Sequence, residues 1–452
     1  MIEDATTTVS VPQPQPQPMG MSIHYRRYAL TLLFLVYMLN FVDRQIVNIL
    51  AEPIKRELGL ADWQLGSLTG LSFAIFYASL ALPIARWAER SNRVRIVALS
   101  AITWSLFTTI CGVAQTFAQL FLARVGVGVG EAGCTPASQS LISDYTTREK
   151  RASALAFFSM GIPAGTLVGM VVGGLIADSL GWRASFALVG VPGIILGLLA
   201  YFTLPEPRKS FAASGVQAAP GLREALAELN NKPTYIWLTV AMATMSFGIY
   251  SNLAFQSSHF LRNHAEGLGA LAVRLNDLTG IRLGATGFLG TVLGLIVGLC
   301  GAVGTWLGGW ATDRGVRSSL TAYATIPAAA ALCMPFALFA TYTASNTVAA
   351  LCLMGLPMML QSIYYGPIFA AVQSLVHPRT RATATAIFLF FANLIGLGLG
   401  PLSVGLISDF LAPSIGAGDG IRWALLSTSL AYILAAAAFM VARKSIRQDI
   451  VS

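Results

Sequence analysis

The chain has 452 residues, of which 55% are hydrophobic and only 11% carry a charged side chain. Soluble domains carry about 25% charged residues, so this composition excludes an ordinary soluble protein and indicates one that lies largely in a lipid bilayer. The formal net charge of +9 does not indicate a nucleic-acid partner, because the Lys and Arg residues fall in short segments between long apolar runs and form no basic face.

The chain begins with a polar segment that repeats Gln and Pro between Pro12 and Pro18. This segment lacks the basic start, the apolar run and the cleavage site of a signal peptide. We therefore predict a disordered cytoplasmic tail over residues 1–25. The first apolar run then serves as its own insertion signal.

Twelve apolar runs are long enough to cross roughly 30 Å of hydrocarbon as α-helices. They fall near residues 28–50, 66–88, 94–114, 118–142, 152–178, 184–204, 235–261, 286–312, 319–341, 345–376, 382–409 and 421–442. We therefore predict an all-α polytopic membrane protein. Its predicted parts are an N-terminal six-helix bundle (26–204), a cytoplasmic linker (205–234), a C-terminal six-helix bundle (235–442) and a cytoplasmic tail (443–452).

The basic residues between the runs are distributed unevenly over the two sides of the expected membrane. If the N-terminus is cytoplasmic, most of them fall in cytoplasmic segments, as the positive-inside rule requires. We therefore expect a multi-pass protein of the cell's inner membrane, with both termini in the cytoplasm. Residues 262–285 are then the longest external connection. We expect a solvated loop there, and an extracellular gate is the alternative. We expect the protein to be a monomer.

Three short matches recur in the same order in the two halves of the sequence. Residues 90–93 resemble 314–317, residues 151–156 resemble 381–386, and residues 174–178 resemble 405–409. Matches that keep their order and nearly the same separation indicate two duplicated six-helix halves. Parallel halves related by an axis along the membrane normal are a transporter architecture, with the substrate site between the halves near the midplane.

The first match also predicts a gate on the cytoplasmic side. An acidic residue followed by Arg, with a second Arg three residues later in a tight turn, resembles the signature between helices 2 and 3 of the major facilitators. Such a carboxylate can pair with Arg and cap a neighbouring helix end, which holds the cytoplasmic side closed. Glu89 stands where that signature usually has Asp. The predicted gate residues are Glu89, Arg90, Arg93, Asp313, Arg314 and Arg317.

Charged side chains within the hydrocarbon region are costly and are therefore functional candidates. The first run holds Asp43 and Arg44, and the fourth holds Arg124 and Glu131, two turns apart on one face. Because Asp43 and Arg124 lie at similar predicted depths, an ion pair between these helices is feasible.

We predict that Asp43 and Glu131 carry protons. Burial disfavours a charged carboxylate, a nearby Arg favours it, and a rocking motion can alternate the two surroundings. A static ion-pair network that locks the N-terminal half is the alternative. Arg44 and Arg124 have a second possible role, because guanidinium groups bind anionic headgroups through paired hydrogen bonds.

The runs of the C-terminal half hold no comparable charges and offer aromatic and amide side chains. A polar N-terminal half that faces an aromatic C-terminal half suits an amphiphilic substrate, although ordinary helix packing explains each of these residues equally well. The predicted substrate-cavity residues are Asn40, Phe247, Tyr250, Asn252, Phe255, Gln361, Tyr364, Tyr365 and Phe391.

The sequence offers no motif of an enzyme or of a primary pump. It has no HExxH, CxxC, nucleophile elbow or P-loop, it has only four histidines, and its five cysteines lie singly in apolar runs. We therefore expect no catalytic residue, no metal site and no cofactor. The Gly-rich stretch 126–130 lies inside an apolar run without a βαβ setting, so it predicts close helix packing and not a nucleotide loop.

Two strings resemble the spinster family, a branch of the major facilitators. Residues 40–44 (NFVDR) resemble its Asn-Tyr-x-Asp-Arg motif, and residues 124–132 (RVGVGVGEA) resemble its Arg-x-x-x-Gly-x-Gly-Glu-Ala motif. Residues 180–183 also resemble its loop between helices 5 and 6, and the chain looks like a bacterial member. Spinster-type proteins move lysolipids and sphingosine phosphate. The resemblance implies Asp43 and Glu131 as the protonation pair, with Arg44 and Arg124 in the associated network.

These observations together predict a proton-coupled secondary transporter of amphiphilic, lipid-like substrates that exports them by alternating access. Its expected partners are protons, a small amphiphile such as a lysophospholipid or a sphingosine-phosphate-like lipid, and the bilayer. Two other transporters remain open. One is a proton-driven multidrug exporter that accepts cations, and the other is an importer of small carboxylates or sugars.

Overall fold

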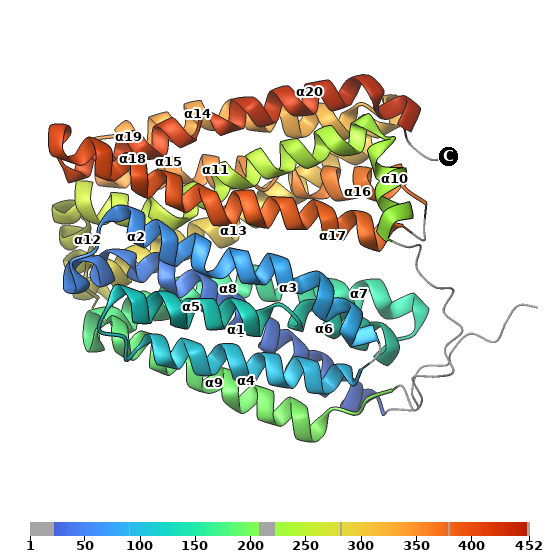
Figure 1. Cartoon of the computed structure of the whole chain (residues 1–452). Helices are drawn as coiled ribbons and strands as arrows, with labels where there is room; N and C mark the ends of the chain where they lie inside the picture. Colours follow the sequence, from blue (N-terminus) through green and yellow to red (C-terminus); the bar gives the residue numbers. More distant parts are fainter. Residues whose placement is uncertain (1–21, 90, 208–221, 281–282, 378–379, 450–452) are drawn as a thin grey trace, which may run out of the picture.

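The chain folds into two bundles of long helices that lie side by side (Figure 1) in a computed structural model that describes residues 22–89, 91–207, 222–280, 283–377 and 380–449. The N-terminal half consists of α1 (Ile23–Leu58), α2 (Asp62–Gly66), the π-helical η1 (Ser67–Leu71), α3 (Ser72–Glu89), α4 (Arg93–Cys111), α5 (Phe117–Glu131), α6 (Cys134–Tyr145), α7 (Arg148–Ser159), α8 (Gly161–Leu180) and α9 (Trp182–Thr203). We call α1–α9 the N-terminal half.

The second bundle, α11–α20, is the C-terminal half. It consists of α11 (Pro233–Asn263), α12 (Ala265–Thr279), α13 (Ala285–Ser318), α14 (Ala322–Thr343), α15 (Thr347–Leu360), α16 (Tyr365–Leu375), α17 (Arg381–Phe391), the π-helical η2 (Ala392–Leu399), α18 (Gly400–Ile415), α19 (Ala417–Thr428) and α20 (Ala431–Asp449). A short helix, α10 (Leu222–Asn230), precedes this half and packs on α11 and α17.

Within the described residues, eleven helices are long and apolar enough to cross a membrane. The remaining predicted span, the fourth, is broken into α5 and α6 at Ala132 and Gly133, so neither piece is long enough to cross by itself. The predicted all-α fold of twelve transmembrane helices in two six-helix halves is confirmed by this arrangement and by the relatives reported below.

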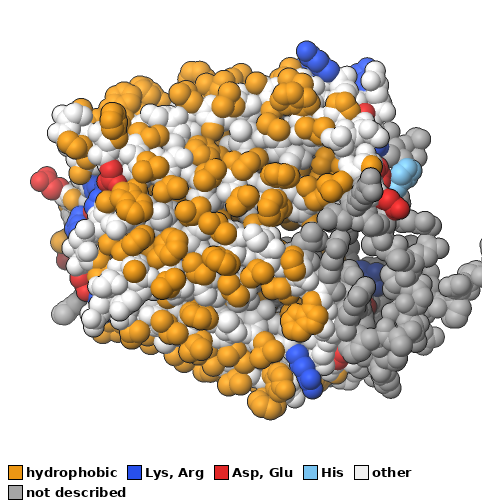
Figure 2. All heavy atoms as spheres, viewed as in Figure 1, with side chains coloured by type: hydrophobic (Ala, Val, Ile, Leu, Met, Phe, Trp, Pro, Cys, Tyr) orange, Lys and Arg blue, Asp and Glu red, His pale blue; other side chains and the backbone are white. Residues whose placement is uncertain are grey.

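The surface of the molecule divides into an apolar band and two polar ends. Figure 2 shows hydrophobic side chains over the central band, with Lys, Arg, Asp and Glu gathered toward the ends. Large side chains such as Phe410 (82% exposed), Phe202 (77%) and Phe336 (73%) project from the bundles. A surface this apolar is stable only against lipid, which makes the chain a multi-pass membrane protein.

We call the end of the molecule that carries α2, α12 and the α18–α19 turn the outer end, because the charge pattern predicts that it is extracellular (Figure 1). The expected external loop contains a helix there, α12. Its side chains Leu268 and Ala272 lie one turn apart and are buried against the bundle, and the helix ends at Gly280 with φ of 74°. This buried apolar stripe explains why the segment is helical and not a solvated loop.

Candidate functional site

The first buried ion pair of the N-terminal half joins α1 to α5. Arg124 Nη1 lies 3.4 Å from Asp43 Oδ2, and the Thr108 hydroxyl of α4 donates to Asp43 Oδ1 over 2.6 Å. Asp43 is 1% exposed and Arg124 is 2% exposed. The predicted pair between the first and fourth spans is therefore present, and a hydroxyl from the third span supports the carboxylate.

The second ion pair lies beside the first. Arg44 Nε donates to Glu131 Oε2 over 2.7 Å, and Glu131 is fully buried. The Arg44 guanidinium also lies among three aromatic rings, with its central carbon 5.2 Å from the centroid of Phe41, 4.7 Å from that of Phe73 and 4.5 Å from that of Tyr77. Ion pairing and ring faces together hold the guanidinium where water is largely excluded.

Glycines bring the helices of this site together. A Cβ atom on Gly169 of α8 would lie 2.8 Å from the carbonyl oxygen of Val42, the residue before Asp43. A Cβ atom on Gly128 of α5 would lie 2.7 Å from the carbonyl oxygen of Phe73. Side chains at these positions would push α8 off α1 and α5 off α3, so the predicted role of the Gly-rich stretch in close packing agrees with the structure.

Several polar atoms of the site have no hydrogen-bond partner among the described residues. They are Glu131 Oε1, Arg124 Nε and Asn40 Oδ1, all from buried side chains. Buried polar atoms are normally paired, and unpaired ones are frequently bound to water or ligand. The site therefore has free capacity for a proton, a water molecule or a polar ligand atom.

A cavity of about 40 Å³ lies between the two halves next to the ion pairs. Its lining residues are Phe41, Arg44, Gln45, Asn48, Thr69, Phe73 and Arg124 of the N-terminal half, with Tyr250, Leu253, Ala254, Leu397 and Pro401 of the C-terminal half. Arg44 and Arg124 line the cavity, whereas Asp43 and Glu131 are not among its lining residues. A ligand in the cavity therefore contacts the two cations before it reaches the two carboxylates.

Of the nine predicted cavity residues, only Tyr250 lines this cavity. Asn252 accepts a hydrogen bond from Tyr342 of α14, inside the C-terminal half. Phe255 belongs to the hydrophobic core, and Phe247 lines a groove of about 530 Å³ formed with α18, α19 and α20.

The other predicted cavity residues do not line the cavity either. Asn40 is buried in α1, Gln361 Nε2 lies 2.9 Å from Met358 Sδ, and Tyr364 stacks on Tyr365 with 4.4 Å between ring centroids. Phe391 is 41% exposed and packs edge-on against its neighbour Phe390.

Sequence reasoning missed the polar residues Gln45 and Asn48, which line the cavity. They follow Phe41 and Arg44 by one turn on α1, so they share the cavity-facing side of that helix. The signal was available, because an amide stripe within an apolar run repeats at the spacing of a helix.

The predicted cytoplasmic gate is described only in part, since Arg90 and the side chain of Glu89 lie outside the described residues. Arg93 is 1% exposed and binds Asp144 of α6 (2.6 Å) and Glu206, which follows α9 (2.5 Å). The remaining three residues are exposed: Asp313, Arg317 and Arg314, whose guanidinium lies 4.2 Å from the ring centroid of Trp310.

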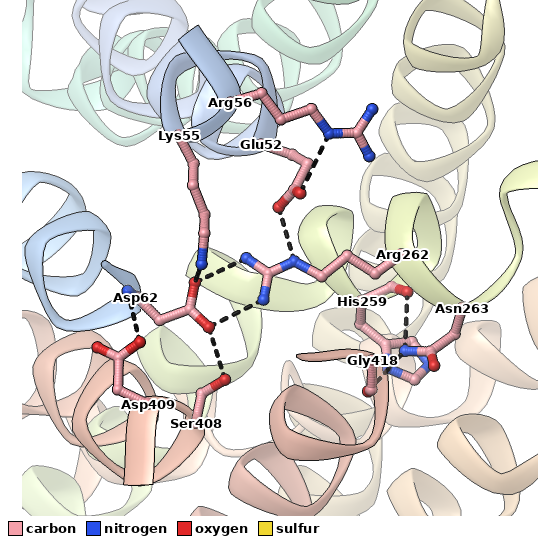
Figure 3. Close-up of polar contacts among 10 residues, drawn as sticks. All are labelled: Glu52, Lys55, Arg56, Asp62, His259, Arg262, Asn263, Ser408, Asp409 and Gly418. Carbon is pink, nitrogen blue, oxygen red and sulfur yellow. Dashed lines mark hydrogen bonds and ion pairs between the residues drawn. The ribbon is translucent and has the colours of Figure 1, made fainter. Parts of the chain in front are cut away.

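Hydrogen bonds between the halves gather at the outer end (Figure 3). Arg262 of α11 donates to both carboxylate oxygens of Asp62, over 2.8 and 2.7 Å, and to Glu52 of α1 over 2.8 Å. Lys55 also binds Asp62, and the Ser408 hydroxyl of α18 donates to Asp62 over 2.6 Å. The outer end is therefore closed. Arg262 belongs to the segment 262–285, for which an extracellular gate was the alternative expectation, but its partners were not predicted.

The family follows from comparison with known proteins. The model of the Major Facilitator Superfamily matches residues 33–401, which is most of the chain. The chain belongs to this superfamily. An efflux pump of the same superfamily from Mycolicibacterium smegmatis is 32% identical over 427 residues, which are 94% of each chain.

The resemblance to the spinster branch is also confirmed. The sphingosine-1-phosphate transporter SPNS2 of Mus musculus is 28% identical over 415 residues, which cover 88% of this chain and 72% of that protein. The crystal structure of a bacterial homologue of the human lysosomal transporter spinster, inward-facing and unoccupied, matches with a TM-score of 0.83 and 29% identity. It covers 96% of this chain and 100% of that one. These relatives are transporters, in agreement with the absence of enzyme motifs.

Proposed function

We propose that this membrane transporter is proton-coupled, works by alternating access and carries amphiphiles that have an anionic headgroup. We place it in the inner membrane as a monomer, with both termini in the cytoplasm. The observation that carries the proposal is the position of the cations relative to the cavity and to their carboxylate partners. Arg44 and Arg124 line the cavity between the halves, and their carboxylate partners, Glu131 and Asp43, lie behind them.

This order couples anion binding to proton uptake. A headgroup that binds Arg44 in the cavity competes with Glu131 for the same guanidinium donors. Glu131 is fully buried, and a buried carboxylate that loses its cation is strongly destabilised until it is neutralised by a proton. Binding of the anion therefore favours binding of the proton, and the reverse. Arg124 and Asp43 form a second ion pair, in which an anion can displace Asp43 in the same way.

The residues around the cavity suit the apolar part of an amphiphile, which can enter only when the halves separate, because the cavity of about 40 Å³ holds no more than a few water molecules. The rings of Phe41 and Phe73 flank the arginines, and Tyr250, Leu253 and Leu397 form the wall contributed by the C-terminal half. The SPNS2 relative is named as a transporter of sphingosine-1-phosphate. This molecule has one anionic headgroup and one alkyl chain. This supports the assignment of a lipid-like substrate to the cavity.

The experiment is flux in liposomes that hold the purified protein and an imposed pH gradient. Oleoyl lysophosphatidate serves as the anionic probe, and albumin extraction reports which leaflet or compartment holds it. We expect gradient-driven flux in the wild type and its loss in Glu131→Gln and Asp43→Asn. A surface carboxylate in one half, Asp419, provides the matched control Asp419→Asn. Wild-type flux that ignores the gradient would refute the coupling.

A second candidate, export of cationic drugs, is favoured by the similarity to the Mycolicibacterium smegmatis efflux pump. A cation would pair with Glu131 or Asp43 and would compete with protons for these carboxylates. Flux of ethidium in the same liposomes, without flux of lysophosphatidate, would favour this candidate. Gradient-driven flux of a small sugar acid that lysophosphatidate does not inhibit would instead favour an importer of small carboxylates.

A further inference from the structure

We propose that the outer end is held closed by two equivalent helix caps that cross between the halves. In each, an Asp at the outer end of one half accepts from the first turn of a helix in the other half: Asp409 from two backbone N–H groups and Asp178 from one. We call them the Asp409 cap and the Asp178 cap. The inference rests on the alternating-access part of the proposed function and not on the substrate or on proton coupling.

The Asp409 cap joins α18 to the start of the span Asp62–Ala81. The backbone N–H of Asp62 donates to Asp409 Oδ1 over 2.9 Å (Figure 3). The backbone N–H of Trp63 donates to Asp409 Oδ2 over 2.8 Å. The first N–H groups of a helix lack intrahelical partners and carry partial positive charge, so a carboxylate there is stabilised. Ser408 and Arg262 reinforce this cap by binding the Asp62 side chain.

The Asp178 cap joins α8 to the start of α13. The backbone N–H of Gly287 donates to Asp178 Oδ2 over 2.6 Å. A Cβ atom on Gly284 would lie 2.6 Å from Asp178 Cγ, and one on Gly287 would lie 2.7 Å from Asp178 Oδ2. Glycine at both positions therefore leaves the room that the carboxylate occupies.

The two caps are related by the internal repeat. Asp178 ends the segment 174–178, and Asp409 ends the matching segment 405–409. Both segments begin with a glycine at a close helix crossing. A Cβ atom on Gly174 would lie 2.8 Å from the carbonyl oxygen of Thr286, and one on Gly405 would lie 2.3 Å from that of Asp62. The repeated Gly-x-x-x-Asp pattern thus supplies the close approach and then the capping carboxylate.

Opening of the outer end must break both caps, because each carboxylate and its N–H partners belong to opposite halves. Removing either carboxylate charge should therefore raise the outward-open population. We expect about a twofold to fivefold increase for each of Asp409→Asn and Asp178→Asn, the range typical of a carboxylate at a helix N-terminus. The double variant should multiply the two effects if the caps act independently.

The readout is alkylation of a cavity residue from outside the cell. With the five native cysteines replaced by serine, Asn48→Cys places one thiol on the cavity lining. A membrane-impermeant maleimide then reacts at a rate proportional to the outward-open fraction, even where that fraction is small. The matched control is Asp419→Asn, since Asp419 pairs with Arg422 inside the C-terminal half. The control should leave the rate unchanged.

Wild-type alkylation rates in both single cap variants would overturn the proposal. If the Asn variants fail to fold, Gly405→Ala tests the same closure by another route. Its added Cβ would collide with the Asp62 carbonyl only while the halves are closed, so it too should raise the rate. The assay measures access to the cavity, and in it no substrate is added and no pH gradient is imposed. A failure of the caps and a failure of proton-coupled lipid transport are therefore seen in different experiments.

Discussion

Arg44 and Glu131 form the ion pair that joins the cavity to the buried interior of the N-terminal half. Arg44 Nε lies 2.7 Å from Glu131 Oε2, with 16% of the Arg44 side chain exposed and none of the Glu131 side chain. The Arg44 guanidinium thus faces the cavity, whereas the Glu131 carboxylate is surrounded by protein. This asymmetry is the physical basis of the coupling, because a ligand can take the guanidinium away from a carboxylate that solvent does not reach.

Glu131→Gln should uncouple transport and leave substrate exchange intact. The amide keeps the shape of the side chain and can still accept from Arg44, but it cannot bind and release a proton. We expect gradient-driven accumulation to fall at least about tenfold, while counterflow of labelled against unlabelled substrate continues, because only the proton step is lost. Counterflow and accumulation measured in one liposome preparation check this. Equal loss of both would mean that Glu131 has a structural role.

Binding of an anionic substrate should strengthen as the pH falls. If one proton is taken up with the anion, linkage requires the dissociation constant to fall by up to about tenfold per pH unit through the titration. Binding of a cationic drug at the same carboxylates has the opposite sign, because proton and drug then compete. Titrations of lysophosphatidate and of ethidium at several pH values separate the two candidates. A pH-independent affinity for both would contradict the shared-arginine scheme.

Phe73 connects the two arginines. Its ring centroid lies 4.7 Å from the Arg44 guanidinium carbon and 5.7 Å from that of Arg124. Phe73→Leu keeps an apolar side chain and removes the ring face, which is worth about 0.5–2 kcal/mol to a neighbouring cation. We expect the Michaelis constant for an anionic substrate to rise about threefold to tenfold, with a small change in maximal rate. Phe255→Leu, at a buried position of α11 that does not line the cavity, is the control and should leave this constant unchanged.

Sequence reasoning found the charged centre because an ionisable residue in an apolar run is rare and has few explanations. The pairing of Asp43 with Arg124 followed from depth alone, since helix rise fixes how far each residue lies from the membrane surface. The residues that the C-terminal half contributes to the cavity wall were harder to predict. Asn252 and Tyr250 are two residues apart, so they point to nearly opposite sides of α11, and only packing against α14 decides which side faces the cavity.

The contacts of the outer end were beyond sequence reasoning for a different reason. The repeat that ends at Asp178 and Asp409 was visible, but its role depends on which helix of the other half begins beside each carboxylate. That register belongs to the packing of the halves and leaves no local pattern. The break of the fourth span at Gly133 was likewise missed, because the predicted run 118–142 has no charged residue after Glu131 to mark it.

Linker helix α10 should stay docked to the C-terminal half near neutral pH and loosen in acid. Glu228 accepts from the Thr380 hydroxyl over 2.6 Å and from the His377 backbone N–H over 3.1 Å. Burial acts to raise the pKa of Glu228, but these hydrogen bonds outweigh it and hold the pKa below its model-compound value of 4.5. A lowered carboxylate pKa stabilises docking above that value, and this stabilisation is lost as the pH falls through the lowered pKa.

Hydrogen exchange of the α10 amides measures this docking. We expect Glu228→Gln to speed exchange in α10 at pH 7 and to make little difference once the pH is well below 4.5, where the wild-type carboxylate is itself protonated. Glu224→Gln, a change of charge on the same helix, is the matched control and should leave exchange unchanged. Faster exchange in both variants would mean that the charge on the helix causes the effect. The contacts of Glu228 with Thr380 and His377 would then not hold α10 in place.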